Sequence, residues 1–263
     1  MRYFIHLAYD GTRYRGWQRQ LNTPDSIQEI IETTLSRMTG RQMTVTGCGR
    51  TDAGVHARQY FAHIDYPGFD FDPVERLNRM LPDDISVFDF IPVHDRAHTR
   101  YDAVQRSYEY HLHFFKDPFL SLYSTHMVTN PPDPLIIREG LDFLMSMRDF
   151  RYMCLTPNRA KHTICPLDAA TCEFSDDGLR MKFRFTAARF LKSMIRIIVA
   201  RLLELGSGKI TMATFEDINT GHGRLKYSTI TYPQGLHLVS VRYPYLDIPV
   251  RSALLPGNPF VSR

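Results

Sequence analysis

One short segment places a carboxylate among arginines and glycines. Residues 47–58 read GCGRTDAGVHAR, with Asp52 two residues after Arg50. Carboxylates flanked by arginines stay ionised, and an ionised aspartate is what nucleophilic catalysis requires. Glycines serve where the backbone turns sharply or meets a ligand closely. The alternative is an ordinary hairpin whose aspartate stabilises its own turn, the more common role of a single Asp between glycines.

A second group of cations lies further along the chain. Arg189, Lys192 and Arg196 are spaced by three and four residues, which predicts one face of a helix. A buried arginine in so apolar a helix needs an anionic partner. If the face is exposed, the three residues form only a basic surface stripe. The apolar residues of the same helix are Phe190, Ile195, Ile198, Val199, Leu202 and Leu203.

A third stretch interleaves aromatic and basic residues. His98, Arg100 and Tyr101 are followed by Arg106 and Tyr108. Proteins hold an unstacked base and its phosphates with such side chains. An ordinary half-buried strand gives the same pattern, because tyrosine is a good strand former. Only a meeting of the three groups in space would favour the functional interpretation.

Hydrophobic periodicity predicts the elements that position these residues. A capping box at Ser26 opens a helix that ends at Gly40, and Asp177-Gly178 predicts a hairpin turn. The order β-α-β-β-α-β occurs twice, with a join near residues 94–104. The predicted strands cover 3–9, 43–48, 58–65, 85–93, 104–114, 169–174, 179–187 and 236–243, and the other helices cover 73–81, 134–147, 190–205 and 211–219.

This order predicts an α+β fold of two ferredoxin-like halves. The first half, residues 1–100, carries the Asp52 loop. The second half, residues 101–263, adds an extra helix and a C-terminal tail. We expect the two sheets to lie side by side around a central cleft, because clefts between domains are favoured binding sites.

The composition limits the class of protein. The 263 residues carry a net charge of +4, with 43% hydrophobic and 23% charged residues, which excludes whole-chain disorder and coiled coil. Four cysteines are too few for a disulfide scaffold. The sequence has neither a membrane-spanning apolar stretch nor a signal peptide at Met1, so we expect a cytoplasmic protein.

The sequence motifs typical of cofactor and metal binding are absent or incomplete. No CxxC, HExxH or GxGxxG pattern occurs, which argues against a metal site or a dinucleotide. Gly208-Lys209 resembles a phosphate loop, but Leu203 stands at the first glycine and Ile210 at the Ser/Thr position.

Taken together, several motifs resemble the tRNA pseudouridine synthase A (TruA) family. The likeness runs in order through most of the chain, and the block GRTDAGVH at 49–56 is its most specific part. The other matching residues are Tyr9-Asp10-Gly11, Tyr14, Gly16-Trp17-Gln18, Gln20, Leu81-Pro82, Asp84-Ile85, His98, Arg100, Arg106, Tyr108, Tyr110, Met194, Arg196 and Gln234-Gly235-Leu236.

The resemblance implies an isomerase that converts uridine to pseudouridine at positions 38, 39 and 40 of the tRNA anticodon stem-loop. It implies that no cofactor or metal takes part, that the target base is flipped out of the helix, and that the enzyme acts as a homodimer whose two subunits hold one tRNA. It also agrees with the doubled ferredoxin-like architecture.

The same resemblance assigns roles to residues. Asp52 matches the nucleophile, which could bond to C1′ or to C6 of the nucleotide or remove the 2′ proton. Tyr108 would stack on the uracil and manage the proton at C5. Arg196 would form a partly buried ion pair with Asp52, and Arg50 would fill the space left by the flipped base. The tRNA contacts would come from His98, Arg100 and Tyr101 of the segment 97–101, the loop 157–162, Lys116, Arg189 and Lys192.

The chain departs from the family pattern in three places. Lys192-Ser193 stands where many relatives have two histidines, His237 replaces a tyrosine or phenylalanine, and residues 221–232 are unusually basic. Two other functions remain open on the residues alone. One is a non-catalytic tRNA-binding or chaperone module; the other is a hydrolase with Asp52 as phosphate acceptor, which would call for Mg²⁺ and further carboxylates.

Overall fold

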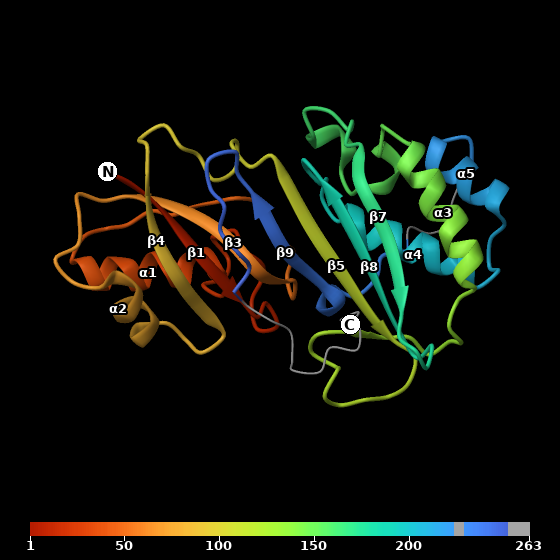
Figure 1. Ribbon diagram of the computed structural model, residues 1–263, viewed down its shortest axis with the longest axis horizontal. Helices are drawn as coiled ribbons and strands as arrows, with labels where there is room; N and C mark the ends of the chain where they lie inside the picture. The colour runs from red at the N-terminus through yellow and green to blue at the C-terminus, as the bar shows by residue number, and fades with distance from the viewer. Residues whose placement is uncertain (224–228, 252–263) are drawn as a thin grey trace. The chain divides into compact units, whose positions relative to one another are not determined.

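The computed structural model describes residues 1–223 and 229–251 (Figure 1). The chain combines α-helices and β-strands in two compact units. One unit comprises Met1–Arg106 and the segment that begins at His237, and the other comprises Ser107–Leu236. Parts of the basic segment (224–228) and of the C-terminal tail (252–263) lie outside the described residues.

Among its described residues, the first unit has four main strands and two helices. Its strand order is β4-β1-β3-β9, with the short β2 beside β3. Strand β1 pairs antiparallel with β3 and β4, whereas β9 pairs in parallel with β3. The elements are β1 (Arg2–Tyr9), α1 (Ile27–Thr39), β2 (Thr46–Gly47), β3 (His56–Asp65), α2 (Pro73–Met80), β4 (Ile85–Val93) and β9 (Leu236–Arg242).

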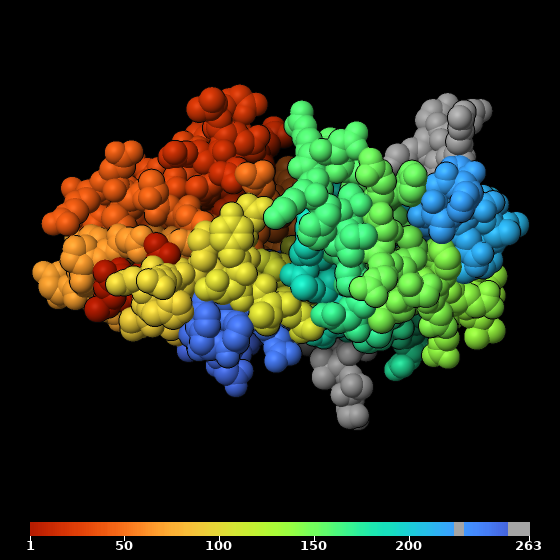
Figure 2. Space-filling view, turned by 90° about the horizontal axis from the view of Figure 1, so that it is seen from above, coloured from red at the N-terminus to blue at the C-terminus, as the bar shows by residue number. Residues whose placement is uncertain are grey.

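The second unit has the strand order β5-β8-β7, with β6 beside β5. Helix α3 packs against β7 and α4, and Figure 2 shows α5 in blue beside the light-green residues of α3. The elements are β5 (Gln105–His113), β6 (Thr125–His126), α3 (Pro134–Ser146), β7 (Leu167–Phe174), β8 (Arg180–Ala187), α4 (Met194–Gly206) and α5 (Met212–Thr220), with short 3₁₀ turns at Arg151–Met153, Pro157–Arg159 and Pro233–Gly235.

Local sequence signals explain where several elements begin and end. Ser26 Oγ accepts the N–H of Glu29 at 3.3 Å at the start of α1, and Gly40 ends the helix in the left-handed conformation with φ 68°. The N–H of Ser26 donates to the carbonyl of Pro24 at 3.0 Å. The expected hairpin at Gly178 (φ 68°) joins β7 to β8. The serine cap, the Gly40 stop and the Gly178 turn are confirmed, but the second half of the capping box is wrong, because the Ser26 N–H bonds to Pro24 and not to the Glu29 carboxylate.

Two predicted elements differ from the observed ones by more than two residues at one end. The strand expected over 43–48 is reduced to Thr46–Gly47, because the N–H groups of Met43 and Val45 donate to Ser36 Oγ and Glu32 Oε1 of α1 instead. The helix expected from Phe190 begins only at Met194, because Ser193 has a positive φ of 57° that interrupts the helical geometry.

The last strand adds to the sheet of the first unit. Strand β9, expected within the C-terminal half, pairs with β3 through His56–His237 and Ala57–Leu238. The chain therefore returns to its N-terminal unit before the tail. Among the described helices, none has the length and apolar character needed to cross a bilayer.

Candidate functional site

The Asp52 side chain lies on the loop between β2 and β3. It is half-buried, between the buried Thr51 and the exposed Ala53, while Arg50 is exposed. The backbone carbonyl of Asp52 accepts the N–H of Val55 at 3.2 Å, which closes a tight turn. Gly54 follows with φ 75°, a conformation that favours glycine. The sequence prediction of a sharp glycine-dependent turn is confirmed.

A second segment, residues 9–17, supports this loop from behind. The N–H of Trp17 donates to the carbonyl of Thr51 at 3.2 Å, and the Tyr9 hydroxyl lies 2.9 Å from Thr51 Oγ1. The backbones approach so closely that a Cβ on Gly11 would lie 2.0 Å from the carbonyl oxygen of Val55, and one on Gly16 would lie 2.5 Å from that of Thr51. Glycine is needed at both positions to admit the Asp52 loop.

Two aromatic residues fix the start of the same loop. Trp17 and Tyr60 stack with their ring centroids 4.0 Å apart, and the Tyr60 hydroxyl donates to the carbonyl of Gly49 at 2.6 Å. A Cβ on Gly47 would lie 2.1 Å from the Tyr60 hydroxyl oxygen. The loop is therefore held by specific hydrogen bonds on both sides of Arg50.

Arg50 is oriented by a chain of polar side chains that sequence reasoning missed. Its Nε donates to Gln18 Oε1 at 3.2 Å, and Gln18 Nε2 donates to Gln28 Oε1 at 2.7 Å. Gln28 Nε2 then donates to Glu32 Oε1 on α1 at 3.0 Å. The motif Gly16-Trp17-Gln18 contained the signal, because its glutamine directly follows the residues that pack on the loop.

His98, Arg100 and Tyr101 lie together in a turn after β4. His98 Nδ1 accepts the N–H of Arg100 at 3.1 Å, and its ring centroid lies 4.2 Å from that of Tyr101. Burial lowers the pKa of His98, because it disfavours the imidazolium form. Tyr101 is 74% exposed, and the Arg100 guanidinium lies 5.9 Å from its ring centroid. An exposed, pre-oriented aromatic ring of this kind can stack on a nucleic-acid base.

Tyr108 and Arg196 lie in the second unit. The buried Tyr108 ring packs edge-to-face on Phe190, with centroids 5.1 Å apart. The half-buried Arg196 lies in the first turn of α4, and its Nε donates to the carbonyl of Thr231 at 2.7 Å. Thr231 donates back to the carbonyl of Arg196 from its N–H at 3.3 Å and its hydroxyl at 3.1 Å.

Tyr110 holds the segment that contains Thr231. Its hydroxyl donates to the carbonyl of Tyr232 at 2.7 Å and lies 2.7 Å from Thr125 Oγ1. Burial raises the pKa of Tyr110 to about 12, so the hydroxyl keeps its proton and acts as a donor. Sequence reasoning missed Thr231, since 35 residues separate it from Arg196.

The basic residues before α4 lie beside the 157–162 loop. Arg189 Nη1 lies 2.9 Å from His162 Nε2, and the carbonyl of Lys192 accepts the N–H of Leu155 at 3.0 Å. The prediction that Arg189, Lys192 and Arg196 share one helix face is wrong, because only Arg196 lies in α4. Lys116 is exposed in the segment between β5 and β6.

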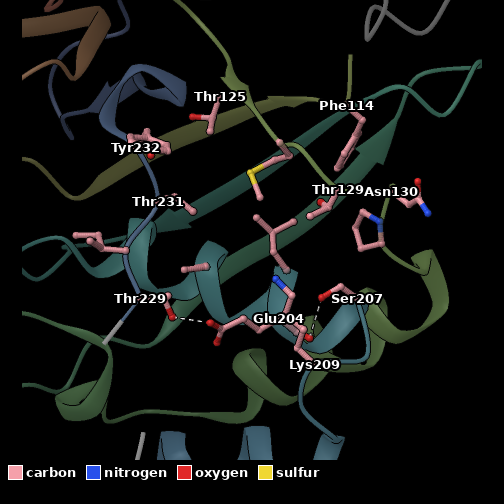
Figure 3. A pocket seen from close by; sticks show the side chains of 15 residues that line it. Phe114, Thr125, Thr129, Asn130, Glu204, Ser207, Lys209, Thr229, Thr231 and Tyr232 are labelled. Carbon is pink, nitrogen blue, oxygen red and sulfur yellow. Dashed lines mark hydrogen bonds between the residues drawn. The ribbon is translucent and has the colours of Figure 1, made fainter. Parts of the chain in front are cut away.

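The second unit also contains a cavity of about 190 Å³. Figure 3 shows its lining and the hydrogen bond from the Thr229 hydroxyl to Glu204, 2.7 Å long. None of the predicted site residues lines it, although Thr231 does. Within residues 1–223 and 229–251, no three His, Cys, Asp or Glu side chains gather to hold a metal ion.

The structure places the predicted residues in two groups, one in each unit. Arg50, Asp52 and the His98–Tyr101 turn belong to the first unit. The second unit contains Tyr108 and Arg196 with the cations Lys116, Arg189 and Lys192. The first group offers a carboxyl group on a loop held by hydrogen bonds and an exposed aromatic ring, and the second offers a buried phenol and an oriented guanidinium.

Comparison with known proteins shows which family the chain belongs to. A family model described as tRNA pseudouridine synthase matches residues 147–244. The chain is 41% identical to tRNA pseudouridine synthase A of Bacteroides fragilis, covering 92% of this chain and 96% of the relative. It is 39% identical to the Bacteroides thetaiotaomicron protein of that name (92% and 91%) and 36% identical to the Porphyromonas gingivalis one (92% and 97%). The chain therefore belongs to the tRNA pseudouridine synthase A family.

Proposed function

We propose that this protein is a tRNA pseudouridine synthase that isomerises uridine at positions 38, 39 and 40 of the anticodon stem-loop. The observation that carries the proposal is Asp52, held on a glycine-braced loop within the most specific motif of the family. Membership of the family, at 41% identity over 92% of the chain, supports the same reaction.

The reaction exchanges one bond of the nucleotide for another. The N1–C1′ glycosidic bond breaks, the uracil turns, C5 bonds to C1′, C5 loses its proton and N1 gains one. Asp52 acts at the first stage by one of three routes: attack on C1′, attack on C6, or removal of the 2′ proton. Each route needs an ionised carboxylate at a fixed position, which a rigid loop provides.

The other proposed catalytic residues act on the base and on Asp52. Tyr108 stacks on the uracil and handles the proton at C5, and its contact with Phe190 supports a fixed ring position. Arg196 forms an ion pair with Asp52. Arg50 fills the space that the flipped base leaves.

Binding of the RNA falls to the aromatic platform and the cations. His98, Arg100 and Tyr101 hold unstacked nucleotides, and Lys116, Arg189 and Lys192 contact phosphates. This binding must offset the few kcal/mol that flipping a base costs.

The proposal extends to architecture and assembly. Two ferredoxin-like halves, 1–100 and 101–263, would have their sheets side by side around a central cleft, and a homodimer would hold one tRNA across both subunits. The reaction would need no cofactor or metal and would take place in the cytoplasm.

Replacement of Asp52 tests the proposal. Asp52→Ala should lower pseudouridine formation at positions 38–40 by about a thousandfold or more while tRNA binding persists. Asp176→Asn, in the exposed hairpin turn between β7 and β8, is the matched control and should keep wild-type rates. The substrate is tRNA from cells that lack this protein, with pseudouridine mapped by sequencing.

Each contrary result points to a different alternative. Wild-type activity of Asp52→Ala would exclude Asp52 as nucleophile. A wild-type protein that binds tRNA without modifying it would be a binding module or chaperone. A wild-type protein that forms no pseudouridine but hydrolyses a phosphate ester, with that activity lost in EDTA, would be the metal-dependent hydrolase, and pseudouridine formation that survives EDTA would exclude it.

A further inference from the structure

Arg106 joins two loops of the first unit through a single nitrogen atom. Its Nη2 donates to the carbonyl of Cys48 at 2.8 Å and to the carbonyl of Arg100 at 2.9 Å. Its Nη1 donates to the carbonyl of Ala103 at 3.4 Å. The half-buried side chain therefore spans from the start of the Asp52 loop to the His98–Tyr101 turn.

The Cys48 carbonyl depends on this donor because the sheet ends there. The N–H of Cys48 still pairs with the carbonyl of Phe61 at 2.8 Å, but the next carbonyl, that of Gly49, bonds to the Tyr60 hydroxyl. Cys48 is fully buried, so loss of a donor to its carbonyl carries a desolvation cost. Arg106 thus fixes the backbone four residues before Asp52.

The Arg100 carbonyl lies in a turn that ends with the exposed Tyr101. This turn is closed by the N–H of Asp102, which donates to the carbonyl of His98 at 3.0 Å. Because the two hydrogens of Nη2 point in fixed directions in the guanidinium plane, the two carbonyls are held at a fixed relative position. An ammonium on a flexible stem does not impose that geometry.

We propose that Arg106 is a positioning residue that couples the Asp52 loop to the His98–Tyr101 turn. The coupling rests on the proposed roles of Asp52 and Tyr101. Through it, a nucleotide stacked on Tyr101 stabilises the loop arrangement in which Asp52 meets the flipped uridine. Arg106 itself touches neither the base nor the ribose.

A double-mutant cycle tests the coupling. Arg106→Lys should lower kcat/KM about tenfold to a hundredfold, with a fall in kcat as well as a rise in KM. The fold-decrease in kcat/KM caused by Tyr101→Ala should be at least three times smaller in the Arg106→Lys background than in the wild type, because Arg106→Lys has already removed the link between the two loops. Arg37→Lys, an exposed arginine of α1, is the control for the exchange of side chains. Equal Tyr101→Ala penalties in both backgrounds would overturn the proposal.

Hydrogen exchange without RNA gives a readout that does not depend on catalysis. In Arg106→Lys, amides of both 48–52 and 98–102 should exchange faster, while those of β1 and β4 stay unchanged. If Arg106→Lys does not fold, Arg106→Gln, which keeps one amide donor, replaces it in both experiments. Faster exchange in only one of the two segments would refute the coupling, and absence of pseudouridine formation by the wild type would refute the proposed function instead.

Discussion

Arg196 and Thr231 are joined by three hydrogen bonds. Arg196 Nε donates to the carbonyl of Thr231 at 2.7 Å, and Thr231 donates from its N–H and its hydroxyl to the carbonyl of Arg196. The guanidinium plane at the start of α4 is therefore set by a segment 35 residues later, which Tyr110 holds in turn. An arginine fixed in this way can present its remaining donors in one direction.

The first prediction concerns the guanidinium itself. Arg196→Lys keeps the charge but loses the planar group that bonds to Thr231, so the cation moves away from its position. We expect kcat to fall about a hundredfold, more than the accompanying fall in the thermal unfolding midpoint explains. Steady-state pseudouridine assays and calorimetry measure both. Arg138→Lys, on the exposed face of α3, is the control, and full activity of Arg196→Lys would contradict the assignment.

A second prediction concerns the residue that holds Thr231 in place. Tyr110→Phe removes the donor to the Tyr232 carbonyl, which should lower the free energy of unfolding by about 1–3 kcal/mol. Because the segment that binds the Arg196 guanidinium is then less firmly held, kcat should also fall, but less than in Arg196→Lys. Urea unfolding and kinetics test this, with Tyr66→Phe as the control for loss of a hydroxyl. An unchanged unfolding free energy would show that the bond contributes nothing.

Much of the fold could be predicted from local signals. The strand over 85–93, the cap at Ser26 and the stop at Gly40 follow from alternation, a short polar side chain and a left-handed glycine, all of which act within a few residues. The Asp52 turn was predictable for the same reason, because Gly54 permits its positive φ.

What failed depended on backbone conformations and side-chain contacts that periodicity does not reveal. Ser193 adopts a positive φ, rare outside glycine, and no local pattern marks it. The strand expected over 43–48 lost its first residues to side chains of α1. The roles of Thr231, Gln18 and Arg106 arise from hydrogen bonds between segments that periodicity alone cannot bring together.

A third prediction follows from the close approach of two backbones behind Asp52. At Gly16 (φ 92°) an alanine would strain the backbone and press on the Thr51 carbonyl, 2.5 Å from its Cβ. We expect Gly16→Ala to lower the free energy of unfolding by about 2–5 kcal/mol and to lower activity further than stability explains. Gly49→Ala is the matched control, because no atom lies within 4 Å of its Cβ. Similar effects of the two substitutions would refute this account.

The fourth prediction concerns the electrostatic part of tRNA binding. The exposed Lys192 is proposed to contact phosphate, so Lys192→Gln should weaken binding and reduce the slope of log K against log salt by about 1. Arg37→Gln, which removes one exposed positive charge from α1, is the control and should leave the slope unchanged. Filter binding at several salt concentrations gives both slopes. A wild-type slope near zero would contradict the RNA-binding proposal as a whole.

The last prediction uses the buried imidazole beneath the His98–Tyr101 turn. His63 is only 6% exposed, its Nδ1 lies 2.8 Å from Thr99 Oγ1, and burial lowers its pKa to about 4. The unfolded state binds a proton near pH 6.5 that the folded state does not, so stability is full above that pH and declines as the pH falls from 6.5 to 4. This histidine alone should contribute a slope of at most about 1.4 kcal/mol per pH unit.

His6, His98 and His113 have lowered pKa values as well, so the difference between His63→Gln and the wild type isolates the contribution of His63. Urea unfolding between pH 4 and 8 should show a shallower decline for His63→Gln than for the control His222→Gln. Parallel curves for the wild type and His63→Gln would mean that His63 accepts its proton equally well in both states.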